Sequence, residues 1–140
     1  MCLEKSKIHE NNYSKPFVAE KDIIVYKALD HRDCYTGKKR LCTPYQYYPI
    51  SFTDGKCVMD GDLECTHRRS VSIGFHAFTS EESIKFTCEM FPETKMTKHW
   101  AIIPKGSKYF LGKDGNEIVS NKLIIFRTRE DFREYRRNQK

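Results

Sequence analysis

Short runs of β-branched and aromatic residues recur along this chain, and turn-forming residues separate them. Such runs are typical of strands, and the glycines and prolines between them mark turns. The runs predict five strands, at residues 22–29, 71–78, 99–103, 108–111 and 117–127, the last one bent near residues 120–121. The pattern as a whole predicts a mostly antiparallel sheet.

Two further segments are weaker candidates for strands. Residues 42–52 (CTPYQYYPISF) look extended but contain Pro44 and Pro49, and proline cannot donate to a ladder. We therefore expect an edge strand or an ordered loop there. Residues 57–59 lie between two turn signals and form a short strand at most. Residues 31–40 (HRDCYTGKKR) are expected to be a charged connection.

Two pairs of residues have the spacing of a capping box, Thr79 with Glu82 and Thr128 with Asp131. The first predicts a helix that ends near Pro92, with one apolar stripe formed by Ile84, Cys88 and Phe91. The second predicts a charged C-terminal helix whose anchors are Phe132 and Tyr135. The predicted fold is therefore a single α+β domain with one capped helix between strands and a short helix at the C-terminal end.

The length of 140 residues fits one domain. Residues 1–20 are polar without periodicity, so we expect a flexible N-terminal arm or an edge extension there, followed by the domain at residues 21–140. No apolar run approaches the ~20 residues of a membrane span, and the N-terminal region has no apolar segment of a secretory signal. We expect a cytoplasmic protein without membrane contact.

The net charge of +6 is concentrated near the C-terminal end. Residues 122–140 contain seven basic and three acidic side chains, and the preceding 121 residues contain 18 and 16. A protein that grips a phosphate backbone over a whole face carries a larger and more widespread basic surplus. The charge distribution therefore argues against nucleic acid as a partner.

The six cysteines contain no Cys-x-x-Cys pair, which structural zinc sites commonly use. Disulfide frameworks belong to oxidising compartments, and no export signal is evident. We therefore expect reduced thiols and no metal. The cysteines are Cys2, Cys34, Cys42, Cys57, Cys65 and Cys88.

Gly74 and His76 make the strand at 71–78 the first choice for a binding site. A glycine inside a strand marks a bulge or a close approach by another group. Alternation places His76 opposite the apolar side chains of its strand, near a helix start at Thr79 that offers free amides to an anion. His76 can equally be a core residue that hydrogen-bonds a neighbouring carbonyl.

Three other residues complete the predicted ligand site. Tyr47 belongs to a tyrosine run that can stack on a flat ligand or cover the sheet as a lid. Arg69 and Lys108 belong to basic clusters that can hold phosphate or lie solvated in turns.

Two resemblances to known families add to these expectations. A strand containing Val25–Ala28 and a Gly-Phe-His-Ala strand at Gly74–Ala77 precede a capped helix and a closing strand pair. This order resembles a group of small uncharacterised phage and bacterial proteins with a Gly-x-His-Ala motif, over about residues 22–127. That group implies no function.

The same order is similar to that of small ADP-ribosyltransferases. These enzymes place a basic residue or histidine on an early strand, a serine/threonine motif on a middle strand and a glutamate on a later one. The matching residues are Lys27, His31 or Arg32, then Phe78-Thr79-Ser80, then Glu117. The resemblance implies that the first two groups hold NAD and that the glutamate stabilises positive charge on the ribose. On this view the catalytic residues are Arg32, Ser80 and Glu117.

Three functions of different classes follow. The preferred one is a non-enzymatic domain that binds a small anionic or nucleotide-like ligand without a cofactor, because no nucleophile–base pair or phosphate loop is evident. The second is the ADP-ribosyltransferase-like enzyme, with NAD. The third is a phage-encoded protein-interaction module that inhibits a host enzyme through its tyrosine-rich surface. The oligomeric state stays open, a homo-oligomer included.

Overall fold

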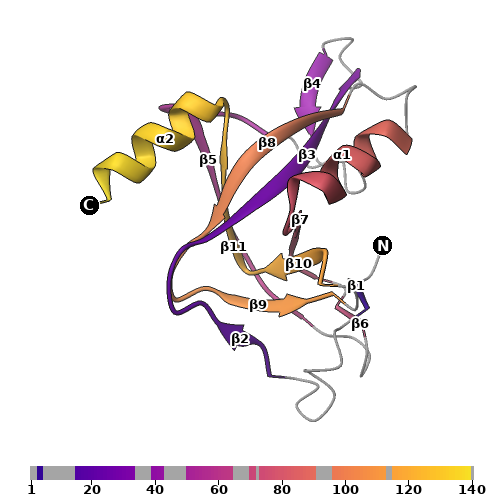
Figure 1. Cartoon of the computed structure of the whole chain (residues 1–140), viewed down its shortest axis with the longest axis vertical. Coiled ribbons are helices and arrows are strands. Elements are labelled where there is room, and N and C mark those ends of the chain that lie inside the picture. Colours follow the sequence, from indigo (N-terminus) through magenta and orange to yellow (C-terminus); the bar gives the residue numbers. More distant parts are fainter. Residues whose placement is uncertain are drawn as a thin grey trace.

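Figure 1 shows the computed structural model, which describes residues 3–4, 15–33, 39–42, 50–64, 70–71, 73–90, 96–112 and 115–139. The strands in these residues are β1 (Leu3–Glu4), β2 (Phe17–Val18), β3 (Ile23–Asp33), β4 (Lys39–Cys42), β5 (Lys56–Asp60), β6 (Ser70–Val71), β7 (Phe75–Phe78), β8 (Met96–Ile103), β9 (Lys108–Leu111), β10 (Glu117–Ser120) and β11 (Lys122–Phe126). The helices are α1 (Glu81–Met90) and α2 (Arg129–Asn138). Neither described helix is long and apolar enough to span a membrane.

Nine of the described strands form one sheet in the order β2-β9-β10-β7-β3-β8-β11-β5, with β4 paired to β3. Strands β1 and β6 form a separate pair. All pairings between these strands are antiparallel. With one helix between strands and one after them, the structure confirms the predicted α+β domain.

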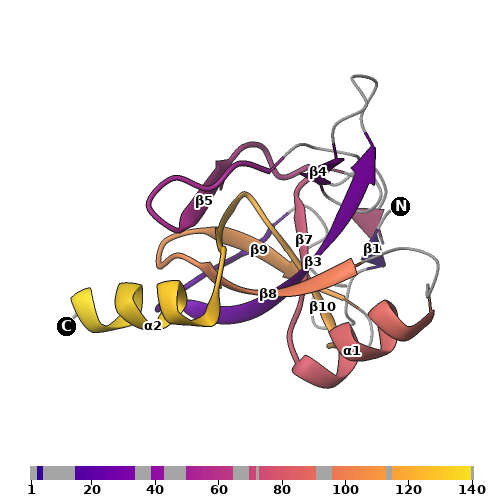
Figure 2. The same ribbon diagram turned by 90° about the horizontal axis from the view of Figure 1, so that it is seen from above.

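Both ends of the sheet contribute to the same core, so the sheet curves round it. Side chains of β9, next to the edge strand β2, and of β5, at the other edge, pack on one cluster of buried residues. The inner face of the sheet is the face that meets this cluster, which consists of Ala19, Val25, Leu29, Ile50, Met59, Ala77, Ala101, Ile103, Ile118, Leu123 and Ile125. The outer face carries both helices, and Figure 2 shows them on one side of the sheet with β3 and β8 running between them.

Two predicted strands are each divided in two. The strand predicted at 71–78 becomes β6 and β7, because Gly74 between them has a φ of 152° and leaves the extended conformation. The strand predicted at 117–127 becomes β10 and β11, which bend at Asn121, where the carbonyl accepts from the amide of Gly61.

The described residues of the segment 31–40, expected to be a charged connection, lie in strands. Strand β3 continues to Asp33 and pairs with β4, with Arg32 opposite Arg40. Backbone ladder hydrogen bonds form whatever the charge of the side chains, so the charged composition did not exclude strands here. Residues 43–49, within the predicted edge strand or loop, lie outside the described residues.

The capping box predicted at Thr79 and Glu82 is wrong by one residue. Ser80 caps α1, and its Oγ accepts from the Ser83 amide at 3.3 Å. The Thr79 amide donates instead to Asn116 O at 2.9 Å, which keeps Thr79 tied to the chain before β10. The helix therefore starts one residue later.

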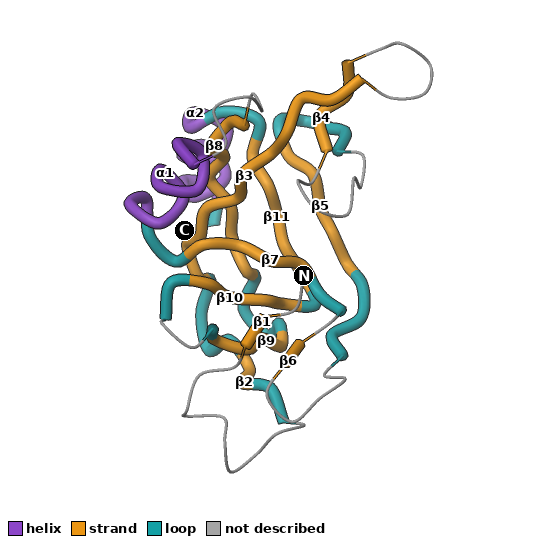
Figure 3. The backbone as a smooth tube through the Cα atoms, turned by 90° about the vertical axis from the view of Figure 1, so that its right-hand side faces the viewer, coloured by secondary structure: helices purple, strands orange, loops and turns teal. Residues whose placement is uncertain are grey.

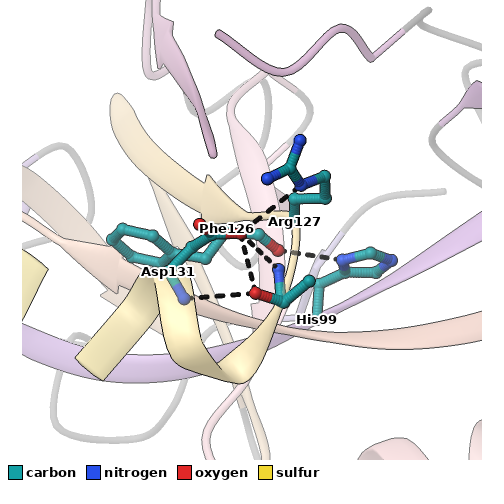
Figure 4. Close-up of polar contacts among 5 residues, drawn as sticks. His99, Phe126, Arg127 and Asp131 are labelled. Atoms are coloured by element: carbon teal, nitrogen blue, oxygen red, sulfur yellow. Dashed lines mark hydrogen bonds and ion pairs between the residues drawn. The ribbon is translucent and has the colours of Figure 1, made fainter. Parts of the chain in front are cut away.

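The capping box predicted at Thr128 and Asp131 is confirmed. The Asp131 amide donates to Thr128 Oγ1 at 3.1 Å, and the Thr128 amide donates to Asp131 Oδ2 at 3.2 Å. Arg127 Nε lies 3.5 Å from the same carboxylate oxygen. Beside this turn, His99 Nδ1 on β8 donates to the Phe126 carbonyl at 2.9 Å (Figure 4). The start of α2 is thereby fixed to the end of β11, which in turn is joined to β8.

Two aromatic residues anchor α2, as predicted. Phe132 stacks on Trp100 with ring centroids 5.2 Å apart, and Tyr135 meets Phe126 at 5.2 Å. Beyond Tyr135 the described side chains of the helix are exposed. The last turn therefore contributes little buried surface.

Deleting residues 136–140 should leave the melting temperature within about 2 °C of the wild-type value, because exposed sites contribute within about 0.5 kcal/mol. Thermal unfolding followed by circular dichroism measures this. A fall of more than about 5 °C would contradict the assignment of the end of α2 as dispensable.

The sheet begins before residue 21. Phe17–Val18 forms β2, the edge strand that pairs with β9. Ala19 is buried, its amide donates to Ser107 O at 2.8 Å, and its carbonyl accepts from the Gly106 amide at 2.8 Å. Residues 17–19 thus form an edge extension of the domain.

Candidate active site

Three neighbouring strands bring an early, a middle and a late segment of the chain side by side. Strand β7 lies between β3 and β10, with Phe78 opposite both Tyr26 and Glu117. Directly opposed residues of antiparallel strands share one face of a sheet. Tyr26, Phe78 and Glu117 therefore form a row on the outer face, and this row is the centre of the candidate site.

The segment after Phe78 is fastened to the turn before Glu117. Thr79 Oγ1 donates to Gly115 O at 2.7 Å, in addition to the bond between the Thr79 amide and Asn116 O. Ser80 Oγ lies 2.9 Å from Ser83 Oγ and caps α1. Both hydroxyls of the predicted serine/threonine motif are thus engaged in positioning the helix start beside β10.

Glu117 is the first residue of β10 and is half-buried. Its backbone carbonyl accepts from the Gly112 amide at 2.8 Å. Within the described part of the chain its carboxylate has no hydrogen-bond or ion-pair partner. A half-buried carboxylate of this kind is available to a ligand, and no cation among the described side chains pairs with it.

Lys27 lies next to the row, but its side chain is on the inner face. It shares that face with Val25 and Leu29, and its Nζ donates to the His76 carbonyl at 2.5 Å. Burial lowers the pKa of the Lys27 amine from 10.5 to about 8. Of the basic residues predicted for the first role, Lys27 is the one that the sheet places beside the middle strand.

Arg32 and His31 lie farther along β3, where the strand pairs with β4. Arg32 is six residues beyond Tyr26, which corresponds to about 20 Å along a strand. Their side chains lie outside the described residues. The backbone therefore does not bring Arg32 to Ser80 and Glu117.

His76 is on the outer face, opposite Val119 of β10. Its Nε2 atom is buried and has no hydrogen-bond partner among the described residues. Burial, followed by the charge of Lys27, lowers the pKa of the His76 imidazole from 6.5 to about 4. The ring therefore stays neutral at physiological pH, which is typical of a packed histidine.

Acid should destabilise the protein through His76. The unfolded state takes up a proton at His76 near pH 6.5 and the folded state only near pH 4. The contribution of His76 to the free energy of unfolding is therefore complete above pH 6.5. It falls by up to about 3 kcal/mol as the pH drops to 4. Urea unfolding of the wild type and His76→Gln at both pH values measures this, since the variant should lose less stability. Equal losses would contradict the lowered pKa.

Gly74 marks a close approach, but protein side chains make it. A Cβ atom built on Gly74 would lie 2.6 Å from Val119 Cγ2 and 2.8 Å from Leu63 Cδ1. The space that the sequence assigned to a ligand is thus occupied by the packing of Val119 and Leu63 against the backbone.

The other predicted ligand residues do not gather around His76 in the described structure. Lys108 is exposed on β9, two strands from β7, and its amide donates to Asn121 Oδ1 at 2.9 Å. Buried Phe110 and Val119 lie between the two positions. Tyr47 and Arg69 lie outside the described residues.

An aromatic surface that the sequence patterns did not predict continues the row. Tyr26 is opposite Trp100 of β8, with ring centroids 5.0 Å apart. Lys98 Nζ and the Arg129 guanidinium lie 5.5 and 5.1 Å from the Trp100 ring, and Lys98 pairs with Glu81 at 3.4 Å. Burial, then the charge of Glu81, raises the pKa of the Tyr26 hydroxyl. The sequence feature that could have indicated this surface is Trp100, the single tryptophan of the chain.

No group of three or more histidine, cysteine or acidic residues in the described ranges is arranged to hold a metal ion. Cys57 and Cys88 have free thiols. Burial raises the pKa of each thiol above its ordinary value.

Known proteins offer no further guide to the site. The chain matches no protein-family model, no curated protein and no solved structure. Any assignment of function to the row therefore rests on its own geometry and chemistry.

Proposed function

We propose that this protein is an ADP-ribosyltransferase-like enzyme that cleaves NAD at the row of Tyr26, Phe78 and Glu117. One observation supports this above the others: segments from early, middle and late parts of the chain meet on the adjacent strands β3, β7 and β10. The resemblance noted in the sequence requires this proximity. A shared order along the chain does not by itself bring the segments together in space.

The surroundings of Glu117 suit a carboxylate that stabilises positive charge on the ribose. Breaking the bond between ribose C1′ and the nicotinamide nitrogen leaves the electron pair on nicotinamide and positive charge on the ribose. A carboxylate without a cationic partner stabilises that charge more in the transition state than in the ground state. The acceptor, a nucleophile of the target or water, then forms the new bond to C1′ and loses its proton.

The rest of the row suits the flat parts of NAD. Tyr26 and Phe78 offer aromatic faces on either side of the boundary between β3 and β7. Lys98 and Arg129 supply positive charge next to Trp100, at the end of the row away from Glu117. A dinucleotide carries both phosphates and flat rings, and cationic and aromatic side chains suited to them lie together here.

Incubating the full-length protein with NAD tests the proposal. The expected result is release of nicotinamide above a no-protein control, measured by chromatography. The proposal would be overturned if the protein released no nicotinamide at high concentration and also transferred no labelled ADP-ribose to proteins of a cell lysate.

A second candidate, non-enzymatic binding of a nucleotide-like anion, is favoured by the surface around Trp100. Aromatic and cationic side chains lie together there without needing Glu117. For such a domain ADP-ribose and NAD raise the melting temperature, and NAD remains intact. Trp100→Ala should abolish that rise.

A further inference from the structure

We propose that Lys27 is a positioning residue whose buried amine holds the His76 carbonyl in the gap where β3 and β7 part, and thereby sets β7 against Tyr26. The effect on catalysis rests on the function proposed above. The contact itself does not.

The gap is a feature of the sheet. Strand β3 pairs with β8 from Ile23 to Asp30, but with β7 only at Tyr26 and Phe78. Strand β7 pairs with β10 along its whole length. In Figure 3, β7 and β10 run across the view, whereas β3, β8 and β11 run up it. The two groups of strands diverge, and β3 leaves most of β7 without a ladder partner on that side.

Lys27 spans this gap. Its amine donates to the carbonyl of His76, which lies two residues before Phe78, the residue of β7 that pairs with β3. In the described structure this carbonyl is the amine's hydrogen-bond partner, and Lys27 has no carboxylate as a counter-ion. A buried amine without a counter-ion costs folding free energy. The hydrogen bond from Lys27 to His76 explains why the buried amine is there, because it takes the place of a missing ladder bond between β3 and β7.

Among the residues that the structure describes, few other titratable groups face the amine. His76 on β7 is uncharged at neutral pH, and His99 on β8 is the residue directly opposite Lys27. Asp30 on β3 and Glu81 on α1 belong to the outer face. Strand β4 pairs with the other end of β3. The proton equilibrium of Lys27 is therefore dominated by its burial.

The sign of the pH effect follows from this burial. The amine has a pKa of about 8 when buried and about 10.5 in water. Opening the gap hydrates the amine, so protonation below pH 8 favours opening, and rising pH favours the closed arrangement. A neutral amine still donates to the carbonyl. The junction of β3 and β7 is therefore tightest in alkaline solution.

The carbonyl ¹³C chemical shift of His76 in the full-length protein reports the contact directly. In the wild type it should titrate with a midpoint near pH 8. Lys27→Met keeps the apolar stem but removes the donor, so the shift should differ and be constant between about pH 7 and 10. Lys85→Met, at an exposed lysine on α1, is the control and should leave the titration intact.

Amide hydrogen exchange in β7 adds a test that needs no variant. After correction for intrinsic base catalysis, exchange in wild-type β7 should slow by at least about 10-fold between pH 7 and 10. A His76 shift and a β7 exchange rate that are both independent of pH in the wild type would overturn the proposal, whether or not Lys27→Met folds.

These measurements use no NAD, so they separate the contact from the function. If the wild type cleaves NAD, Lys27→Met should lower kcat by at least about 10-fold with a smaller change in KM, because misplacing the row affects the transition state most. An unchanged kcat in a variant that has lost the His76 titration would overturn the link to the row.

Discussion

Glu117→Gln is expected to reduce the release of nicotinamide from NAD by about 10²- to 10⁴-fold. The amide has nearly the shape of the carboxylate but carries no charge. It therefore loses the interaction that strengthens as positive charge develops on the ribose. Binding of NAD in the ground state depends on the rest of the row, so the rise in melting temperature with NAD should persist.

Initial rates and NAD-dependent melting of the purified variant provide both measurements. Glu134→Gln, at an exposed position on α2, is the matched control and should retain full activity. Nicotinamide release that survives Glu117→Gln would contradict the role of Glu117. Stabilisation by NAD without cleavage in the wild type would instead identify the protein as a binding domain.

Gly74→Ala is expected to destabilise the fold by about 3 kcal/mol. At a φ of 152° a side chain is strained whatever the space around it, and the added Cβ lies 2.6 Å from Val119 Cγ2. Val119 is buried on the strand paired with β7, so it cannot move away without disturbing that ladder.

Gly106→Ala separates these two causes. Gly106 also has a positive φ, 88°, but a Cβ there meets nothing within 4 Å. It should cost only the backbone strain, about 1 kcal/mol. Urea unfolding of both variants gives the difference. Equal losses would show that the contact with Val119 and Leu63 adds nothing.

Local sequence patterns predicted the strands and the α2 cap, because both depend on residues near one another in the chain. The start of α1 was misassigned because Thr79 and Ser80 are equally good caps. Hydrogen bonds from Thr79 to Gly115 and Asn116, far along the sequence, decided between them. Strand β4 begins with two charged residues, Lys39 and Arg40, and was likewise not predicted by a pattern of apolar residues.

The row required the register between strands, which the sequence does not encode locally. Glu117 and Phe78 are opposite each other only because β10 pairs with β7 at that offset. The position of Lys27 could be predicted from the sequence, because the residue alternates with Val25 and Leu29 and so shares the core face. Its hydrogen bond to the His76 carbonyl could not be predicted, because that bond depends on where β7 diverges from β3.

The order of strands in the sheet also bears on how the chain acquires its structure. Strand β2 pairs with β9, β3 with β8, and β5 with β11, so several pairings join a segment near the beginning to one near the end. Pairings between distant segments form slowly, because a long loop must close before any contact forms. On the ribosome, β2 and β5 therefore lack their partner strands until β9 and β11 have emerged. Incompletely folded chains that expose apolar surface and unpaired strand edges are the species on which chaperones act.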